Sequence, residues 1–183
     1  MPLMKERNYT VEDIYALPED RRAELIDGVL YDMAPPLRIH QSIVSYLHGT
    51  IYRYIEDCGG ACEVYPAPFG VTLAEDDANY FEPDVSVICD PSKLTDRGCV
   101  GAPDWIMEVV SDSTAGRDNI VKRRKYEEAG VKIYTVIDPR IRTVKVYDFR
   151  EREEANRYQE YTFAMPVPSM LYEDLTLDFT RFL

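Results

Sequence analysis

Short apolar runs rich in β-branched residues recur through the middle of the chain. Three of them, at 85–88 (VSVI), 105–110 (WIMEVV) and 133–137 (IYTVI), are each bounded by Pro, Asp or Gly, which is typical of buried strands. Between the second and the third run, the stretch 118–129 has a helical pattern that Gly130 ends. The order of strand, helix and strand predicts a βαβ-type unit.

Two further patterns lie upstream of this unit, and one lies downstream. Apolar residues at positions 39, 43, 44, 47, 51 and 55 have the period of an α-helix and predict a helix over 39–57. Before it, two apolar runs flank Asp27-Gly28, which predicts a hairpin. Downstream, the segments 143–149 (TVKVYDF) and 157–163 (RYQEYTF) alternate like an antiparallel pair of strands.

Two acidic residues stand at the strands of the central unit. Asp84 directly precedes the run at 85–88, and Glu108 lies inside the run at 105–110. A glutamate inside a buried strand is costly unless it is paired or binds a cation. Adjacent strands would bring both carboxylates to one edge of the sheet, where a divalent cation would offset their repulsion. Oxygen ligands, with the main-chain carbonyl of Val109 as a further one, indicate Mg²⁺ or Mn²⁺.

The predicted helix after Glu108 adds a basic residue to this pattern. On a helix that begins near Asp118, Lys122 shares a face with Asp118, Lys125 and Tyr126. An ammonium group near the metal would orient the attacking water or offset the charge of an anionic transition state. The alternative is that Lys122 pairs with Asp118 on a solvated helix face.

The charge balance limits the classes of partner. The 183 residues fit one domain with a sizeable core, and their net charge is −12. Such a charge argues against general affinity for nucleic acid, because phosphate binding relies on Lys and Arg. A basic stripe nevertheless runs through the second half of the chain, and it either binds a polyanion or is a solvated helix face. Its residues are Arg117, Lys122, Arg123, Arg124, Lys125, Arg140, Arg142 and Lys145.

The four cysteines, Cys58, Cys62, Cys89 and Cys99, have no C-x-x-C spacing. Together with the lack of an export signal, this predicts reduced structural thiols rather than disulfides or a zinc site. The first ten residues contain no apolar segment, and no apolar run approaches the length of a membrane span. We therefore expect a cytoplasmic protein without a membrane partner.

Six short motifs follow one another in a fixed order. They are ELIDG at 24–28, the helix histidine His40, PD at 83–84, EVVS-x-ST at 108–114, D-x-x-x-K-x-x-x-Y-x-x-x-G-V at 118–131 and Y-x-V-x-D at 134–138. This order resembles the Uma-type restriction endonuclease domain of the PD-(D/E)XK nuclease superfamily, over about 9–183. The resemblance implies a single nuclease-like domain over 1–183. Its fold would be α/β, with a restriction-endonuclease-like mixed central sheet flanked by helices and an additional N-terminal hairpin.

The resemblance also assigns roles to residues of the motifs. Asp84 and Glu108 match the two acids that bind the metal. The superfamily often has a lysine two residues after the second acid, where this chain has Val110. The family places that lysine on the following helix, where Lys122 stands.

Two more residues match family positions near the site. Glu24 matches the upstream acid, a further candidate metal ligand, and His40 matches the helix histidine, which would contact the scissile phosphate or adjust the site. The chain departs from the family pattern at Asp112, where a proline is usual, and at Thr135, where a tryptophan is common. Neither position belongs to the proposed metal ligands, so the departures bear on packing.

The implied activity is Mg²⁺- or Mn²⁺-dependent hydrolysis of phosphodiester bonds, with DNA as the substrate and a homodimer as the assembly. Two alternatives stay open from the sequence. One is a catalytically inactive or regulatory nucleic-acid-binding domain, which would keep the same fold. The other is a metal-dependent hydrolase of a small phosphorylated substrate, which the acidic charge balance favours because it needs no wide basic surface.

Overall fold

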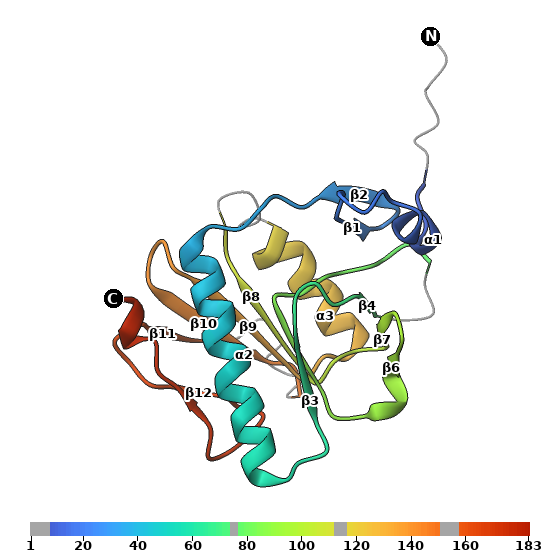
Figure 1. Cartoon of the computed structure of the whole chain (residues 1–183). Helices are drawn as coiled ribbons and strands as arrows, with labels where there is room; N and C mark the ends of the chain where they lie inside the picture. The colour runs from blue at the N-terminus through green and yellow to red at the C-terminus, as the bar shows by residue number, and fades with distance from the viewer. Residues whose placement is uncertain (1–7, 74–76, 112–116, 151–157) are drawn as a thin grey trace.

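A six-stranded mixed sheet, in the order β11-β10-β9-β8-β5-β3, forms the centre of the molecule (Figure 1). Strands β8 and β9 are parallel, and the other neighbours are antiparallel. The computed structural model describes residues 8–73, 77–111, 117–150 and 158–183. The strands of the central sheet are β3 (Glu63–Pro66), β5 (Val85–Ile88), β8 (Trp105–Val109), β9 (Ile133–Asp138), β10 (Thr143–Asp148) and β11 (Tyr158–Thr162).

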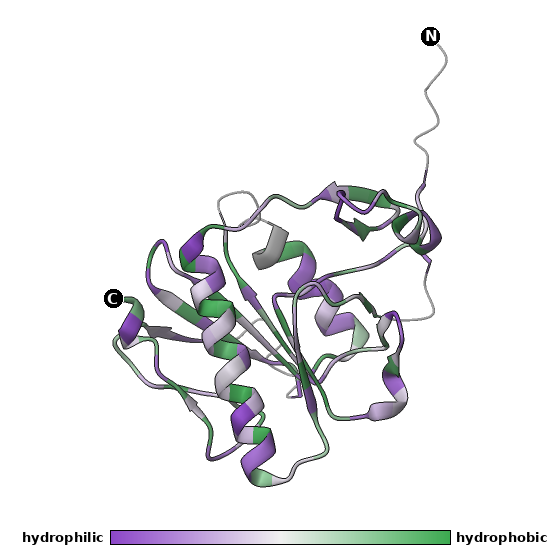
Figure 2. Cartoon of the chain, in the orientation of Figure 1, coloured by the Kyte–Doolittle hydropathy of each residue, from purple (hydrophilic) through white to green (hydrophobic). Residues whose placement is uncertain are grey.

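One helix covers each face of this sheet. Helix α2 (Arg38–Cys58) packs an apolar stripe against one face, and the bands of apolar and polar residues along it are visible in Figure 2. Helix α3 (Arg123–Ala129), which continues the π-helical turn η2 (Arg117–Lys122), packs its buried Tyr126 against the other face. Neither these helices nor any other in the part of the chain described here could cross a membrane.

The alternation of side chains along β8 determines on which face of the sheet Glu108 lies. Met107 and Val109 belong to the apolar cluster under α2, whereas Ile106 and Val110 belong to the cluster under α3. Because successive side chains of a strand point to opposite faces, Glu108 lies on the α3 side. Its contact with the Tyr126 hydroxyl agrees with this placement.

The remaining elements of the described chain form three small sheets and three short helical segments around the central sheet. Strands β1 and β2 pair as a hairpin, β4, β7 and β6 form a three-stranded sheet, and β12 pairs with β13. Their bounds are α1 (Val11–Tyr15), β1 (Ala23–Ile26), β2 (Val29–Asp32), β4 (Val71–Thr72), η1 (Pro91–Lys93), β6 (Leu94–Thr95), β7 (Gly98–Val100), β12 (Val167–Pro168), β13 (Thr176–Leu177) and η4 (Thr180–Phe182).

The predicted fold class is confirmed: a mixed α/β sheet is flanked by helices and preceded by a hairpin. In the hairpin turn, Asp27 and Gly28 have φ of 50° and 77°, as a turn with two left-handed residues requires. Helix α2 ends at Gly59, which has φ of 62°. Strands β6 and β7 were not predicted, because their short segments lack a clear alternation.

The prediction of reduced thiols is wrong for one pair, because Cys62 and Cys89 form a disulfide. Strands β3 and β5 pair with Glu63 opposite Ile88, so the residues just beyond that pair face each other. Their Cα atoms lie 3.8 Å apart. A separation of 27 residues in the chain gives no hint of this neighbourhood, which only the strand register creates.

The close approach of Gly98 to Gly70 yields a stability prediction. Gly98 has φ of +130°, and a Cβ added to it would lie 2.1 Å from the Gly70 carbonyl oxygen. We expect Gly98→Ala to destabilise the fold by at least about 2 kcal/mol, since strain and a backbone clash add together. Gly49, in the exposed part of α2 with nothing near its added Cβ, is the matched control.

Gly49→Ala should stabilise the protein by about 1 kcal/mol, because alanine is the better residue in a helix interior. Urea unfolding of both variants measures the two changes in the free energy of unfolding. Equal stability of Gly98→Ala and the wild type would contradict the close approach of Gly98 to the Gly70 carbonyl beside the β4–β7 pair.

Candidate active site

A cavity of about 360 Å³ lies where the hairpin, the start of α2 and the ends of β5 and β8 meet. The structure brings together all six residues that the sequence nominated for the site, since each of them lines this cavity. They are Glu24, His40, Asp84, Glu108, Val109 and Lys122.

The Lys122 ammonium lies between two glutamates. Its Nζ is 2.8 Å from Glu24 Oε1 and 3.0 Å from Glu108 Oε1, and all three side chains are buried. One positive charge thus stands between two carboxylates that would otherwise repel each other. The alternative partner, Asp118, has a side chain outside the described part of the structure. Lys122 is the last residue of η2, and such π-helical turns are frequent at functional sites.

Tyr126 completes the contacts of Glu108. Its hydroxyl donates a hydrogen bond to Glu108 Oε1 over 2.9 Å. Complete burial, and then the nearby carboxylates, raise the pKa of Tyr126 well above its ordinary value, so the phenol stays protonated and acts as a donor. The sequence placed Tyr126 on the same helix face as Lys122 but did not nominate it for the site. The four-residue spacing between Lys122 and Tyr126, which places both on one helix face, was the sequence signal for this contact.

Asp84 is oriented by the neighbouring strand and by α2. Its Oδ2 accepts the Val109 N–H over 2.7 Å and lies 3.1 Å from His40 Nε2. The register of β5 and β8 pairs Val85 with Met107, so its continuation by one residue places Asp84 opposite Glu108. The two acids therefore meet at the same edge of the sheet, on adjacent strands.

Among the cavity residues that the sequence did not nominate are a basic and an acidic residue, Arg22 and Glu82. Arg22 Nε donates to Glu82 Oε2 over 2.9 Å, and both residues line the cavity. The Glu82 main-chain N–H donates to Glu24 Oε1 over 3.2 Å, which ties this pair to the buried cluster. Their nearness to the ELIDG and PD motifs was the only sequence signal, because Arg22 and Glu82 each stand two residues before a nominated acid.

The N-terminal end of α2 places partial positive charge at the cavity, which favours the binding of anions. Leu37, the N-cap residue, provides no side-chain cap, and it lines the cavity together with His40 and Gln41. The first N–H groups of a helix carry partial positive charge and attract negative groups. This end of the 21-residue helix therefore favours an anionic group in the cavity.

Most of the basic stripe does not reach this cavity. Lys125 pairs with Asp27 of the hairpin turn. Arg123 and Arg124 pair with glutamates one turn further along α3, over 3.4 and 2.7 Å. Of the stripe, only Lys122 lines the cavity among the residues with a described side chain. The solvated-face alternative thus fits α3 better than a groove for a polyanion.

The donors suit a hard cation, although they are few. Within the described ranges, no three His, Cys, Asp or Glu side chains form a group that would hold a metal ion by themselves. Asp84 and Glu108 are carboxylates on adjacent strands at one cavity. Mg²⁺ commonly binds through one or two carboxylates and keeps several waters or phosphate oxygens as ligands. The residues present therefore fit a partly hydrated Mg²⁺ better than a metal with a full protein ligand set.

This protein resembles known proteins both in fold and in sequence. The structure matches the crystal structure of "a putative nuclease belonging to DUF820" from Anabaena variabilis with a TM-score of 0.76. The match covers 95% of this chain and 99% of that one at 20% sequence identity, so it concerns the fold.

A second relative is the "Uncharacterized protein slr1290" of Synechocystis sp., which is 33% identical over 103 residues. The match covers 56% of this chain and 53% of that protein, so this chain matches about half the length of its relative. Residues 11–180, nearly the whole chain, match the family Uma2, described as "Putative restriction endonuclease". The chain therefore belongs to the Uma2 family.

Proposed function

We propose that this protein is a Mg²⁺- or Mn²⁺-dependent endonuclease that hydrolyses phosphodiester bonds in DNA. The observation that carries the proposal is the Lys122 ammonium held between Glu24 and Glu108, in a cavity that Asp84 also lines. Two acids on adjacent strands with a buried lysine are the groups that metal-assisted phosphodiester hydrolysis needs. Membership of a restriction endonuclease family supports the same reaction.

Asp84 and Glu108 would hold the metal, with the Val109 carbonyl as a neutral oxygen ligand and Glu24 as a candidate further ligand. When bound, the metal lowers the pKa of a water molecule and offsets charge on the phosphoryl oxygens. The hydrogen bonds from Val109 N–H to Asp84 and from the Tyr126 hydroxyl to Glu108 keep both carboxylates in place. This orientation before binding reduces the reorganisation needed during the reaction.

The other groups of the cavity would act on the phosphate and on the water. The Lys122 ammonium can offset the negative charge of the transition state or orient the attacking water. His40 lies on the first turn of α2, where its imidazole and the helix N–H groups can receive the scissile phosphate. Arg22 offers a guanidinium at the cavity wall for a neighbouring phosphate oxygen. In a homodimer, two such sites would cut both strands of a duplex.

A second candidate function is the hydrolysis of a small phosphorylated substrate. The observation that favours it is the pairing of Arg123, Arg124 and Lys125 with acidic residues, which leaves little free positive charge beside the cavity. Assays with plasmid DNA, single-stranded DNA and bis(4-nitrophenyl) phosphate separate the two candidates. An endonuclease nicks DNA at low protein concentration, whereas a small-substrate hydrolase turns over only the nitrophenyl ester.

One prediction from the proposed function concerns the two acids. Glu108→Gln and Asp84→Asn should each lower Mg²⁺-dependent cleavage of DNA at least ~100-fold, because each removes a charged metal ligand. Glu56→Gln, on the exposed side of α2, is the control and should cut at the wild-type rate. Nicking of supercoiled plasmid over a range of Mg²⁺ concentrations measures the loss. Full activity of Glu108→Gln would place the metal elsewhere.

The second prediction concerns Lys122. Lys122→Met should abolish cleavage and, without metal, lower the free energy of unfolding by about 3–5 kcal/mol, because two buried carboxylates lose their counter-charge. Added Mg²⁺ should recover part of the melting temperature, because it binds only the native state. Lys125→Met removes a surface ion pair and should cost less than about 1 kcal/mol. If Lys122→Met cuts at the wild-type rate, the lysine has been wrongly assigned.

A further inference from the structure

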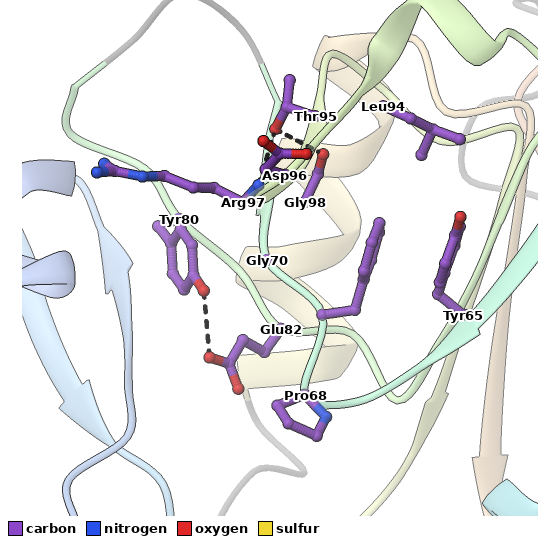
Figure 3. Close-up of a pocket in the computed structure, with 11 residues that line it drawn as sticks. Tyr65, Pro68, Gly70, Tyr80, Glu82, Leu94, Thr95, Asp96, Arg97 and Gly98 are labelled. Atoms are coloured by element: carbon purple, nitrogen blue, oxygen red, sulfur yellow. Dashed lines mark hydrogen bonds between the residues drawn. The ribbon is translucent and has the colours of Figure 1, made fainter. Parts of the chain in front are cut away.

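A second cavity, of about 400 Å³, lies beside the candidate active site (Figure 3). Aromatic residues, the segment from Leu94 to Gly98 and the carboxylate of Glu82 line it. Its volume falls within the range of about 300–1,000 Å³ that is usual for small-ligand sites. None of the motifs in the sequence pointed to this pocket.

One wall of the pocket is a pair of stacked rings. The centroids of Tyr65 and Phe69 lie 4.3 Å apart, and the two ring planes differ by 3°. Both residues line the pocket and are half-buried, with one side packed against the apolar cluster under α3. Flat aromatic surfaces of this kind hold planar π systems, and nucleobases stack on them without regard to sequence.

Tyr80 stands on the other side of the pocket from Tyr65, as Figure 3 shows. Its hydroxyl donates to Glu82 Oε1 over 3.2 Å. Gly70 lets the ring approach closely, since a Cβ there would lie 2.6 Å from the Tyr80 hydroxyl oxygen. Cys99 N–H also bonds the Gly70 carbonyl over 2.8 Å. The Tyr80 ring therefore has a fixed position in the pocket before a ligand binds.

The two cavities share one lining residue, Glu82. It is followed directly by Pro83 and Asp84. A molecule whose phosphate lies at Asp84 therefore has a neighbouring group within reach of the aromatic pocket. In a nucleic acid strand, that neighbouring group is a sugar with its base.

The charges in the pocket suit a base better than a phosphate. Asp96 contributes an exposed carboxylate at the rim, whereas the buried carboxylate of Glu82 is paired with Arg22 and accepts from the Tyr80 hydroxyl. The guanidinium of Arg97 lies over the Tyr15 ring at 4.5 Å and is 3.8 Å from Glu12 Oε1, so its charge is partly offset. Carboxylates repel phosphate but accept hydrogen bonds from the amino groups of adenine, cytosine and guanine.

We propose that this aromatic pocket takes one unstacked nucleobase of the substrate strand, next to the phosphodiester bond held at the candidate active site. The proposal rests on the nuclease function proposed above. The base stacks on the wall formed by Tyr65 and Phe69, while its amino group faces the exposed carboxylate of Asp96. A base can enter only when it has left the helical stack, so single-stranded or locally opened DNA is the preferred substrate.

This subsite would also explain how a protein with a net charge of −12 can hold DNA. Affinity that comes from stacking depends weakly on salt, whereas phosphate contacts make affinity fall steeply as salt rises. We therefore expect the slope of log K against log salt to correspond to about one or two released counterions.

The test compares binding of two single-stranded probes, one a mixed-sequence 12-mer and the other its fully abasic counterpart. Fluorescence anisotropy with Ca²⁺ in place of Mg²⁺ measures binding separately from cleavage. The wild type should bind the intact probe more tightly. Phe69→Leu should weaken binding of the intact probe roughly 5- to 100-fold, the equivalent of about 1–3 kcal/mol for one stacked base. It should leave binding of the abasic probe unchanged.

Two further variants complete the test. Tyr52→Leu changes an exposed aromatic residue of α2 that does not line the pocket, and it should bind both probes like the wild type. Asp96→Asn changes an exposed residue of the pocket rim, so it tests the site without touching the core. It should reduce the preference for oligo(dC) over oligo(dT), because a neutral amide accepts less strongly from an amino group. Melting temperatures of all variants verify the fold.

The outcomes separate this inference from the nuclease function. An unchanged ratio of intact to abasic affinity in folded Phe69→Leu overturns the base subsite, even if the wild type cuts DNA. An unchanged preference between the two homopolymers in Asp96→Asn overturns the role of its carboxylate. Loss of base-dependent binding in Phe69→Leu supports the subsite even if the wild type cuts nothing, and in that case the nuclease proposal alone fails.

Discussion

The buried ion cluster of Lys122, Glu24 and Glu108 holds the hairpin, the central sheet and the start of the α3 segment together. It joins three parts of the chain, since Glu24 lies in the hairpin, Glu108 in the central sheet and Lys122 at the end of η2. Burying three charged groups costs several kcal/mol for each ion unless their geometry compensates it. The Tyr126 hydroxyl and the Glu82 N–H supply that compensation. The chain thus keeps a costly polar cluster where apolar residues would pack more simply.

The strand register places a third carboxylate, that of Asp84, next to this ion cluster. Asp84 is brought opposite Glu108 by the antiparallel pairing of β5 and β8, and its carboxylate is held by the Val109 N–H. The same segment carries Glu82 to the boundary between the two cavities. One short stretch of chain therefore connects the proposed metal ligands with the aromatic pocket, and a shift of register by one residue would separate them.

The distribution of charge restricts how such a protein can meet a nucleic acid. The basic residues of α3 are paired with acids on the same helix or in the hairpin turn. Among the described residues of the cavity, the groups that attract a phosphate are the beginning of α2, Arg22 and Lys122, and the charges of Arg22 and Lys122 are themselves partly offset by Glu82 and by Glu24 and Glu108. Under the proposed function, a polyanion would be held near one point rather than along a groove. Stacking of a base in the proposed aromatic subsite would supply affinity that the net charge does not.

Elements whose signals are local could be predicted from the amino-acid sequence. Apolar periodicity fixed α2 and the three central strands, Asp27-Gly28 fixed the hairpin turn, and the motifs nominated the six residues that line one cavity. The contacts between distant segments became visible only in the folded chain. Lys125 meets Asp27 across 98 residues, Cys62 meets Cys89 across paired strands, and Tyr65 joins Phe69 and Tyr80 in one pocket. Periodicity and capping act over a few residues, whereas such pairs depend on strand order and register, which local patterns do not encode.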